Sequence, residues 1–249
     1  MKLQVERRQI LLSMFFLVVF SSVTVTQIYA EAQYTRSFTV TITAEKSFFG
    51  IFTWTEDQDK TVTATVSDES YRYWRSDRQR RWYGWHGNWW DYFDDYRWLV
   101  KVGAGHNAVK SIVTQLRVFN LGEEDYVNAV LQMVHQFTYK AGQAPKFAIE
   151  TIVDGTADCD GFSVFVATIL YASGYQVALI MYKEEEHMVA GVHLNEVPKK
   201  ARSDYIYSFT KNGVKYYICE ATGQGGGSPW RVGELGEKYQ GLSAYVIVI

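Results

Sequence analysis

The sequence predicts an α+β fold in which one apolar helix packs against antiparallel strands. Residues 160–173 are apolar on nearly every face, and Gly174 follows in the position that commonly ends a helix. Two strand-like segments come next, Gln176 to Met181 and His187 to Leu194. Asn212-Gly213 then marks a hairpin turn between two further strands. A helix followed by antiparallel strands is an α+β arrangement.

The amino end has the pattern of an export signal. Arg7 and Arg8 precede an uncharged run from Ile10 to Ala30, and Ala30-Glu31-Ala32 supplies an A-x-A cleavage pattern. The run also approaches the roughly 20 residues that span a bilayer, so an uncleaved anchor is the competing interpretation. Residues 1–32 are therefore predicted to be a signal peptide or a membrane anchor, and we expect the protein to be secreted or held at the cell surface.

Residues 33–100 are predicted to form a β-rich and aromatic-rich extension. Ser37 to Thr43 and Thr61 to Val66 alternate polar and apolar residues, and Phe49 to Trp54 is a third candidate strand, which together predict a small antiparallel sheet. From Tyr71 to Trp98 the chain is dense in tryptophan and arginine, residues that stack on sugars or lie at membrane interfaces. Glycines interrupt any helical stripe there, so we favour the interpretation that these rings cover the core.

Two amphipathic helices are predicted after this extension. Apolar residues recur at helical spacing from Val109 to Leu116 and again from Val127 to Val134, with Gly122 between them. Pro145 to Thr151 is predicted to be an extended segment that leads into the central helix, because a proline disfavours helix in the residue before it. Both helices are expected to pack against the core.

Cys159 lies at the predicted start of the central helix, between Asp158 and Asp160. A helix N-terminus carries partial positive charge and unpaired N–H groups, which favour a thiolate and can hold an oxyanion. The two acids oppose the thiolate unless they cap backbone N–H groups. The alternative is that Cys159 only fills space in the core, as buried free cysteines commonly do.

A cysteine nucleophile needs a base and a group that orients the base. The candidate bases are His86, His106, His135, His187 and His193. His187 and His193 lie on the same face of one predicted strand, so alternation does not separate them. Glu220 interrupts the apolar strand Val214 to Ala221, where a carboxylate needs a partner such as a histidine N–H.

A disulfide between Cys159 and Cys219 is the other interpretation of two cysteines in an exported protein. Neighbouring residues of a strand point to opposite faces. A Glu220 that faces the site therefore leaves Cys219 facing away from it.

Other classes of protein are disfavoured by composition and spacing. The net charge of −2 gives no basic footprint for nucleic acid. No histidine, cysteine or acidic pattern has the spacing of a zinc or calcium site, and no Walker or Rossmann glycine pattern is present, so neither metal nor cofactor is predicted.

Several segments resemble the archaeal and bacterial transglutaminase-like proteins, with weaker similarity in the aromatic-rich extension. These segments are Pro145 to Asp160, Leu170 to Ile180, His187 to Val192 and Tyr216 to Thr222. The resemblance implies a papain-like α+β core, with residues 101–249 as the catalytic domain. It implies Cys159 as the nucleophile, His187 as the base and Glu220 as the residue that orients the histidine.

The chain departs from the pattern of that family at three positions. Ala157 stands where the family has glycine, Gly161 where it has an acid, and His135 where it often has a glutamine, which makes His135 the candidate oxyanion donor. The predicted function is extracytoplasmic acyl transfer or hydrolysis at amide bonds of a protein or peptide substrate. The alternative is an inactive cell-surface binding module on the same scaffold.

Overall fold

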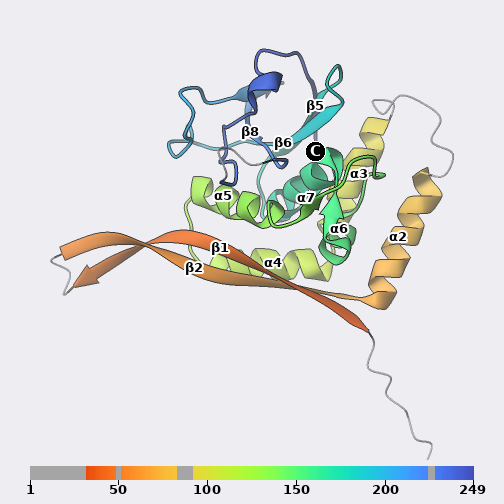
Figure 1. Ribbon diagram of the computed structural model, residues 1–249, viewed down its shortest axis with the longest axis horizontal. Coiled ribbons are helices and arrows are strands. Elements are labelled where there is room, and N and C mark those ends of the chain that lie inside the picture. Colours follow the sequence, from red (N-terminus) through yellow and green to blue (C-terminus); the bar gives the residue numbers. More distant parts are fainter. Residues whose placement is uncertain (1–31, 49–51, 83–91, 224–227) are drawn as a thin grey trace, which may run out of the picture. The chain divides into compact units, whose positions relative to one another are not determined.

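A long antiparallel hairpin begins the part of the chain that the computed structural model describes, which comprises residues 32–48, 52–82, 92–223 and 228–249 (Figure 1). Strand β1 (Gln33–Phe48) pairs with β2 (Phe52–Ser67), with Phe38 opposite Val62. The predicted three-stranded sheet is wrong. The described residues of the third candidate strand begin β2, and Phe49 to Ile51 lie outside the described residues.

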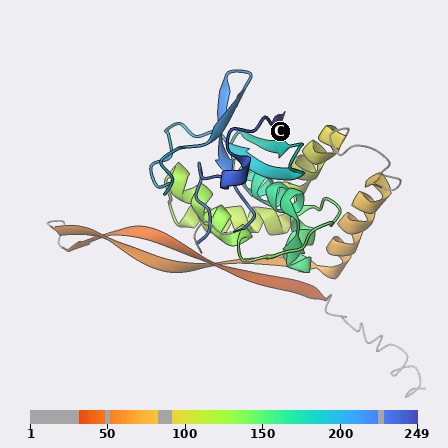
Figure 2. The same ribbon diagram turned by 45° about the horizontal axis from the view of Figure 1, so that its top comes forward.

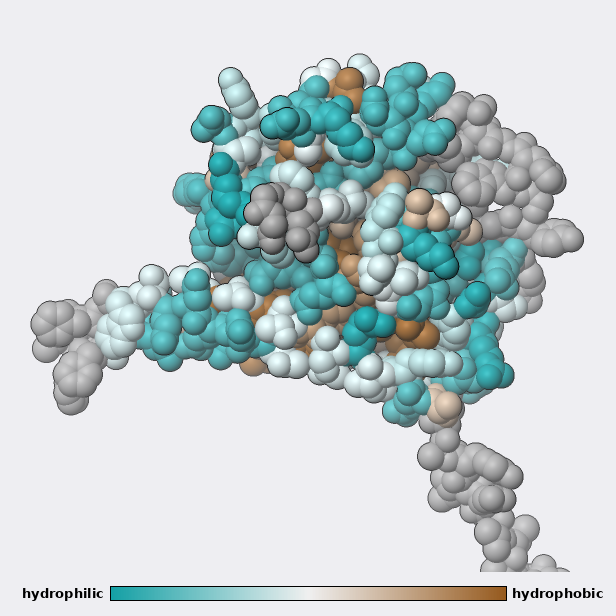
Figure 3. All heavy atoms as spheres, in the orientation of Figure 1, coloured by the Kyte–Doolittle hydropathy of each residue, from teal (hydrophilic) through white to brown (hydrophobic). Residues whose placement is uncertain are grey.

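One face of the hairpin is buried against helices α4 (Asn107–Val118) and α5 (Glu123–Val134), which lie beside it in both ribbon views (Figures 1 and 2). Its buried side chains are Phe38, Val40, Ile42, Val62, Ala64 and Val66. In the space-filling view the free end of the hairpin is largely hydrophilic, and hydrophobic residues appear where the hairpin lies against the helices (Figure 3). The alternation that predicted strands thus also selects the packed face.

Three glutamines hold the hairpin to these helices. The side-chain amide of Gln115 on α4 accepts from the backbone N–H of Thr63 at 2.9 Å and donates to its carbonyl at 2.7 Å. Gln132 on α5 makes the same pair of bonds with Thr41, and Gln136 does so with Thr39. Each amide occupies the hydrogen-bonding groups that a neighbouring strand would use, which protects the edges of the hairpin.

The aromatic and arginine-rich segment forms helices α2 (Asp68–Trp82) and α3 (Phe93–Gly103). The rings of Trp74 and Trp98 pack on Phe147, with centroids 5.0 and 4.8 Å from its ring. These two rings therefore cover the core, as predicted, whereas Trp85, Trp89 and Trp90 lie outside the described residues. The domain boundary predicted between residues 100 and 101 falls inside α3.

A short helix, α6 (Ala148–Asp154), occupies the segment that was predicted to be extended. The Glu150 carboxylate accepts the backbone N–H of Phe147 at 3.1 Å and is itself held by buried Arg78 of α2 at 2.8 Å. The prediction was wrong because this cap depends on a residue distant in sequence, and because Pro145 restricts only the residues before the helix. Strand β4 (Thr156–Ala157) follows and pairs with β3 (Thr138–Tyr139).

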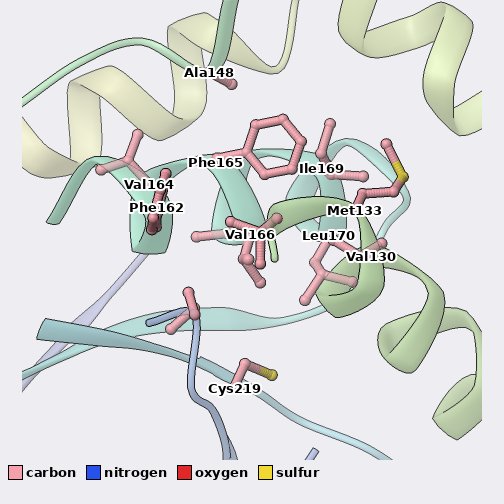
Figure 4. Close-up of a cluster of buried hydrophobic side chains, with 14 of the residues drawn as sticks. Val130, Met133, Ala148, Phe162, Val164, Phe165, Val166, Ile169, Leu170 and Cys219 are labelled. Atoms are coloured by element: carbon pink, nitrogen blue, oxygen red, sulfur yellow. The ribbon is translucent and has the colours of Figure 1, made fainter. Parts of the chain in front are cut away.

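The central helix, α7 (Cys159–Ala172), is buried continuously from Gly161 to Leu170, as its apolar circumference predicts. It packs on a five-stranded sheet of order β7-β8-β6-β5-β9 in which every pair is antiparallel. The strands are β5 (Val177–Tyr182), β6 (His187–Val192), β7 (Ser208–Lys211), β8 (Val214–Cys219) and β9 (Tyr245–Val248). Figure 4 shows Val166 on the side of α7 that faces Cys219, with Phe165 and Ile169 on the other side. The α+β class is confirmed.

The hairpin between β7 and β8 turns at Asn212 and Gly213, whose φ angles are 51° and 77°. Two successive positive φ angles are what a two-residue type I′ turn requires, so the predicted hairpin is confirmed. The predicted signal or anchor segment lies almost wholly outside the described residues. Within the described residues, no helix has both the length and the apolarity to cross a membrane.

Candidate active site

The Cys159 sulfur lies at the first residue of α7, against the start of β6. Its thiol contacts the carbonyl oxygen of Glu186 at 3.7 Å, and it accepts a hydrogen bond from the backbone N–H of Met188. These two residues flank His187 in the chain. The sulfur is therefore held at the backbone on both sides of the histidine, and both cysteines of the chain are free, so the disulfide interpretation is wrong.

His187 and Glu220 form a buried pair at the end of the sheet. Nε2 of His187 donates to Oε2 of Glu220 at 2.9 Å, and the exposed fractions of the two residues are 5% and 1%. This bond commits Nε2, so the nitrogen with a free lone pair on a neutral ring is Nδ1. A carboxylate at this position selects the tautomer in which Nδ1 can act as a base.

The carboxylate of Glu220 is fixed from its other side by Thr222. Oε1 of Glu220 accepts the backbone N–H of Thr222 at 2.8 Å and its hydroxyl at 2.7 Å. The carbonyl of Thr222 is in turn held by the indole N–H of Trp230 at 2.8 Å. Glu220 is thus an acceptor of three bonds in a site that excludes water, which restricts its orientation.

The imidazole of His187 is also held by an aromatic stack that sequence analysis did not identify. The ring of Tyr239, in the short helix η2 (Glu237–Tyr239), lies 4.0 Å from it at an interplanar angle of 8°. Tyr182 of β5 pairs with His187 in the sheet, and its ring stacks on Tyr239 with centroids 5.5 Å apart. No spacing in the sequence relates residues 187 and 239, because the return of the chain through η2 brings them together.

Cys159 and His187 line the same cavity, whose volume is about 600 Å³. Its walls include Tyr139, Met181 and Met188, together with the segment from Ala141 to Ala144. The cavity is large enough for an extended side chain with its flanking peptide groups. Because Cys159 is one of its lining residues, a group bound in the cavity lies next to this residue.

Burial raises the pKa of the Cys159 thiol to about 12, and the charge of Asp160 adds to the rise, whereas the N–H of Met188 opposes it. The prediction that the helix N-terminus favours the thiolate is wrong, because the pKa of the thiol is raised rather than lowered. The helix does begin at Cys159, but desolvation of the sulfur and the neighbouring acids outweigh its partial charge. The resting sulfur therefore carries its proton.

His135 lies near enough to Glu220 to be influenced by its charge. Its Nδ1–H donates to the carbonyl of Leu131 at 2.6 Å, and burial lowers the pKa of its ring. The described residues that line the cavity do not include His135, but they do include Gln143, whose backbone N–H donates to Asp158. The predicted oxyanion donor is thus not among the residues that line the cavity, whereas a glutamine from a different segment is.

His193, which alternation left open as a base, lies away from this site, and its Nδ1 hydrogen-bonds the carbonyl of Lys215 at 3.0 Å. His106 caps α4 by accepting from the N–H of Ala108 at 3.1 Å, and His86 lies outside the described residues.

Comparisons of the chain with family models, curated proteins and solved structures found no match.

Proposed function

We propose that the protein is an extracytoplasmic, cysteine-dependent enzyme with a papain-like, transglutaminase-like core, acting on amide bonds of proteins or peptides. The observation that carries this proposal is the arrangement of three side chains. The thiol of Cys159 lies against both chain neighbours of His187, and the far nitrogen of that histidine is held by buried Glu220. A thiol, an imidazole and a carboxylate in this order are the working parts of a cysteine acyl-transfer site.

The raised pKa of the Cys159 thiol supports general-base catalysis by His187. Nδ1 takes the proton of the Cys159 thiol as the sulfur attacks the amide carbonyl carbon, and Glu220 stabilises the imidazolium that forms. The imidazolium returns the proton to the amine nitrogen, the C–N bond breaks, and a thioester remains on Cys159. An amine or water, deprotonated by the same Nδ1, then attacks the thioester and releases the thiol. An amine yields transamidation, and water yields hydrolysis.

The test uses the full-length protein with casein and a biotinylated primary amine. Biotin incorporation reports transamidation, ammonia release in a parallel reaction without the added amine reports deamidation, and gel electrophoresis reports peptide cleavage. We expect at least one product from the wild type, none from Cys159→Ala, and retained activity from Cys219→Ala, because Cys219 lies in the core. A Cys159→Ala variant that forms product at the wild-type rate refutes the proposal.

The second candidate is an inert surface binding module on the same scaffold, and the raised pKa of Cys159 favours it. Alkylation of Cys159 by iodoacetamide separates the two. If His187 assists the thiol, His187→Ala slows alkylation at neutral pH, because the proton of the sulfur loses its acceptor. If the site is inert, the variant and the wild type react at the same rate.

A further inference from the structure

Two carboxyl groups flank the nucleophile at the start of α7, buried Asp158 and half-buried Asp160. Oδ2 of Asp158 accepts the backbone N–H of Gln143 at 2.8 Å, and Oδ2 of Asp160 accepts the hydroxyl of Tyr96 at 2.9 Å. The side chains of Asp158 and Asp160 lie within hydrogen-bonding reach of each other. A hydrogen bond between two carboxyl groups requires a proton on one of them, because an ionised carboxylate only accepts.

The remaining oxygen of each group points to the same conclusion. Oδ1 of Asp158 and Oδ1 of Asp160 are both buried, and the described part of the chain offers neither of them a donor. Two buried acceptors without donors are costly, and two adjacent negative charges are more so. One proton between the carboxyl groups satisfies both oxygens and leaves the pair with a single negative charge.

We propose that Asp158 and Asp160 share one proton at rest and thereby set the charge beside the Cys159 sulfur. They are positioning residues, since they act through the thiol rather than on a substrate. Their role in catalysis rests on the function proposed above, whereas the shared proton does not.

The surroundings of the pair favour retention of this proton. The pKa of Asp160 is raised well above its usual range by burial first and by its bond to Asp158 second, although the Tyr96 hydroxyl and the Gly161 N–H oppose the rise. Tyr139 faces the same group from β3, and burial followed by the charge of Cys159 raises its pKa. Glu220, from beyond β8, adds a further negative charge near the sulfur.

The proton matters because each carboxylate opposes the thiolate. The charges of Asp160 and Asp158 both raise the pKa of Cys159, after burial. While the pair holds one proton, only one of these charges acts on the sulfur. When alkali removes the proton, the second charge appears and the thiolate becomes harder to form, so we expect the two ionisations to be coupled.

The test is the rate of Cys159 alkylation by iodoacetamide as a function of pH, in the wild type and in Asp160→Asn. The amide has the shape of the carboxyl group, can donate to Asp158 and can accept from Tyr96, so it reproduces the protonated state. We expect the two rates to agree within about twofold at neutral pH, because the net charge of the pair is unchanged, and the variant to react faster in alkali. If both acids are ionised in the wild type, the variant reacts at least about tenfold faster at neutral pH, and the proposal fails.

An infrared measurement on the wild type keeps the proposal testable if the variant does not fold. A protonated carboxyl group absorbs infrared light at a different frequency from a carboxylate, and ¹³C labelling of the aspartate carboxyls assigns the band to aspartate. We expect this band at neutral pH and its loss in Asp160→Asn but not in Asp94→Asn, whose side chain is exposed. Absence of the band in the folded wild type overturns the shared proton, whether or not the protein proves to be an enzyme.

Discussion

Replacement of Glu220 by glutamine should convert the base into the wrong tautomer. The carboxylate accepts one bond from His187 through Oε2 and two from Thr222 through Oε1. Glutamine has a single acceptor oxygen, so it can accept hydrogen bonds either from His187 or from Thr222, but not from both residues. With Glu220 1% exposed, water does not supply the missing group.

The two orientations of the amide differ in free energy. An oxygen turned to His187 places the NH₂ group against the backbone N–H of Thr222, which leaves a buried donor unsatisfied at about 1–3 kcal/mol. An oxygen turned to Thr222 places the NH₂ group against Nε2, which must then present its lone pair, so the proton moves to Nδ1. From this free energy, the second orientation is favoured by roughly 5-fold to 150-fold. It puts the proton on Nδ1, the nitrogen that acts as the base in the proposed mechanism.

The expected loss of activity combines this tautomer preference with the loss of the charge that stabilises the imidazolium. The corresponding change in a serine protease triad lowers kcat by about 10⁴, and we expect a fall in kcat of roughly 10²–10⁴ in the casein assay. Histidine ¹⁵N NMR should show the proton of His187 on Nε2 in the wild type and on Nδ1 in the variant. Glu237→Gln is the matched control, because Glu237 is exposed and lies in η2, the short helix that also carries Tyr239.

The outcome that refutes this reasoning is specific. A folded Glu220→Gln protein that keeps its activity within a few-fold of the wild type shows that the carboxylate does not set the tautomer. An equal loss in Glu237→Gln assigns the effect to charge near the site in general. An unchanged ¹⁵N spectrum together with lost activity separates the tautomer from the charge of Glu220.

Two further predictions concern the segment that leads to the nucleophile. A Cβ at Gly161 would lie 2.7 Å from that of Ala157, so Gly161→Ala should destabilise the protein by about 1–3 kcal/mol, less a gain of about 1 kcal/mol in helix propensity. When Ala157→Gly is also present, the clash is absent and Gly161→Ala should stabilise the protein by about 1 kcal/mol. Urea unfolding of the double-mutant cycle measures both changes, and additive free-energy changes contradict the clash. Burial is the largest single influence on the pKa of Asp154 and raises it, but the hydrogen bonds from Lys146 and Tyr71 and the charges of Lys146 and Arg75 together lower it below its usual value. Its stabilising contribution should therefore be complete above the unfolded pKa of about 4 and be lost as pH falls through the lower folded value, so the stability gap to Asp154→Asn should narrow in acid, and a constant gap argues against this linkage.

Elements whose signal is local could be predicted from the sequence. Helix α7 is covered by the sheet and by other helices, and its 14 consecutive residues are accordingly apolar on nearly all sides, which can be recognised in the sequence. The turn at Asn212-Gly213 needs only its own two residues. Cys159, His187 and Glu220 are predicted from their order and from the resemblance, and the fold brings them to one end of the sheet.

Features that depend on distant partners could not be predicted in the same way. Helix α6 is capped by Glu150, whose carboxylate is held by Arg78 from 72 residues away. The stack of Tyr239 on His187 depends on the course of the chain after β8. The pKa of Cys159 was predicted with the wrong sign because burial of the sulfur is a tertiary property, whereas the helix N-terminus is a local one.

The departures at Ala157 and Gly161 constitute one change in packing rather than two independent losses. The methyl group of Ala157 occupies the space that a side chain at position 161 would need, since the two Cβ atoms would lie 2.7 Å apart. Alanine at 157 therefore requires glycine at 161, and an acid at 161 would require glycine at 157. Compared with the pattern of the transglutaminase-like proteins that the sequence resembles, the chain lacks the acid at 161, but Asp158 and Asp160 flank the thiol with their hydrogen-bond partners in place. These two departures are thus compensated by each other and do not by themselves argue for an inert site.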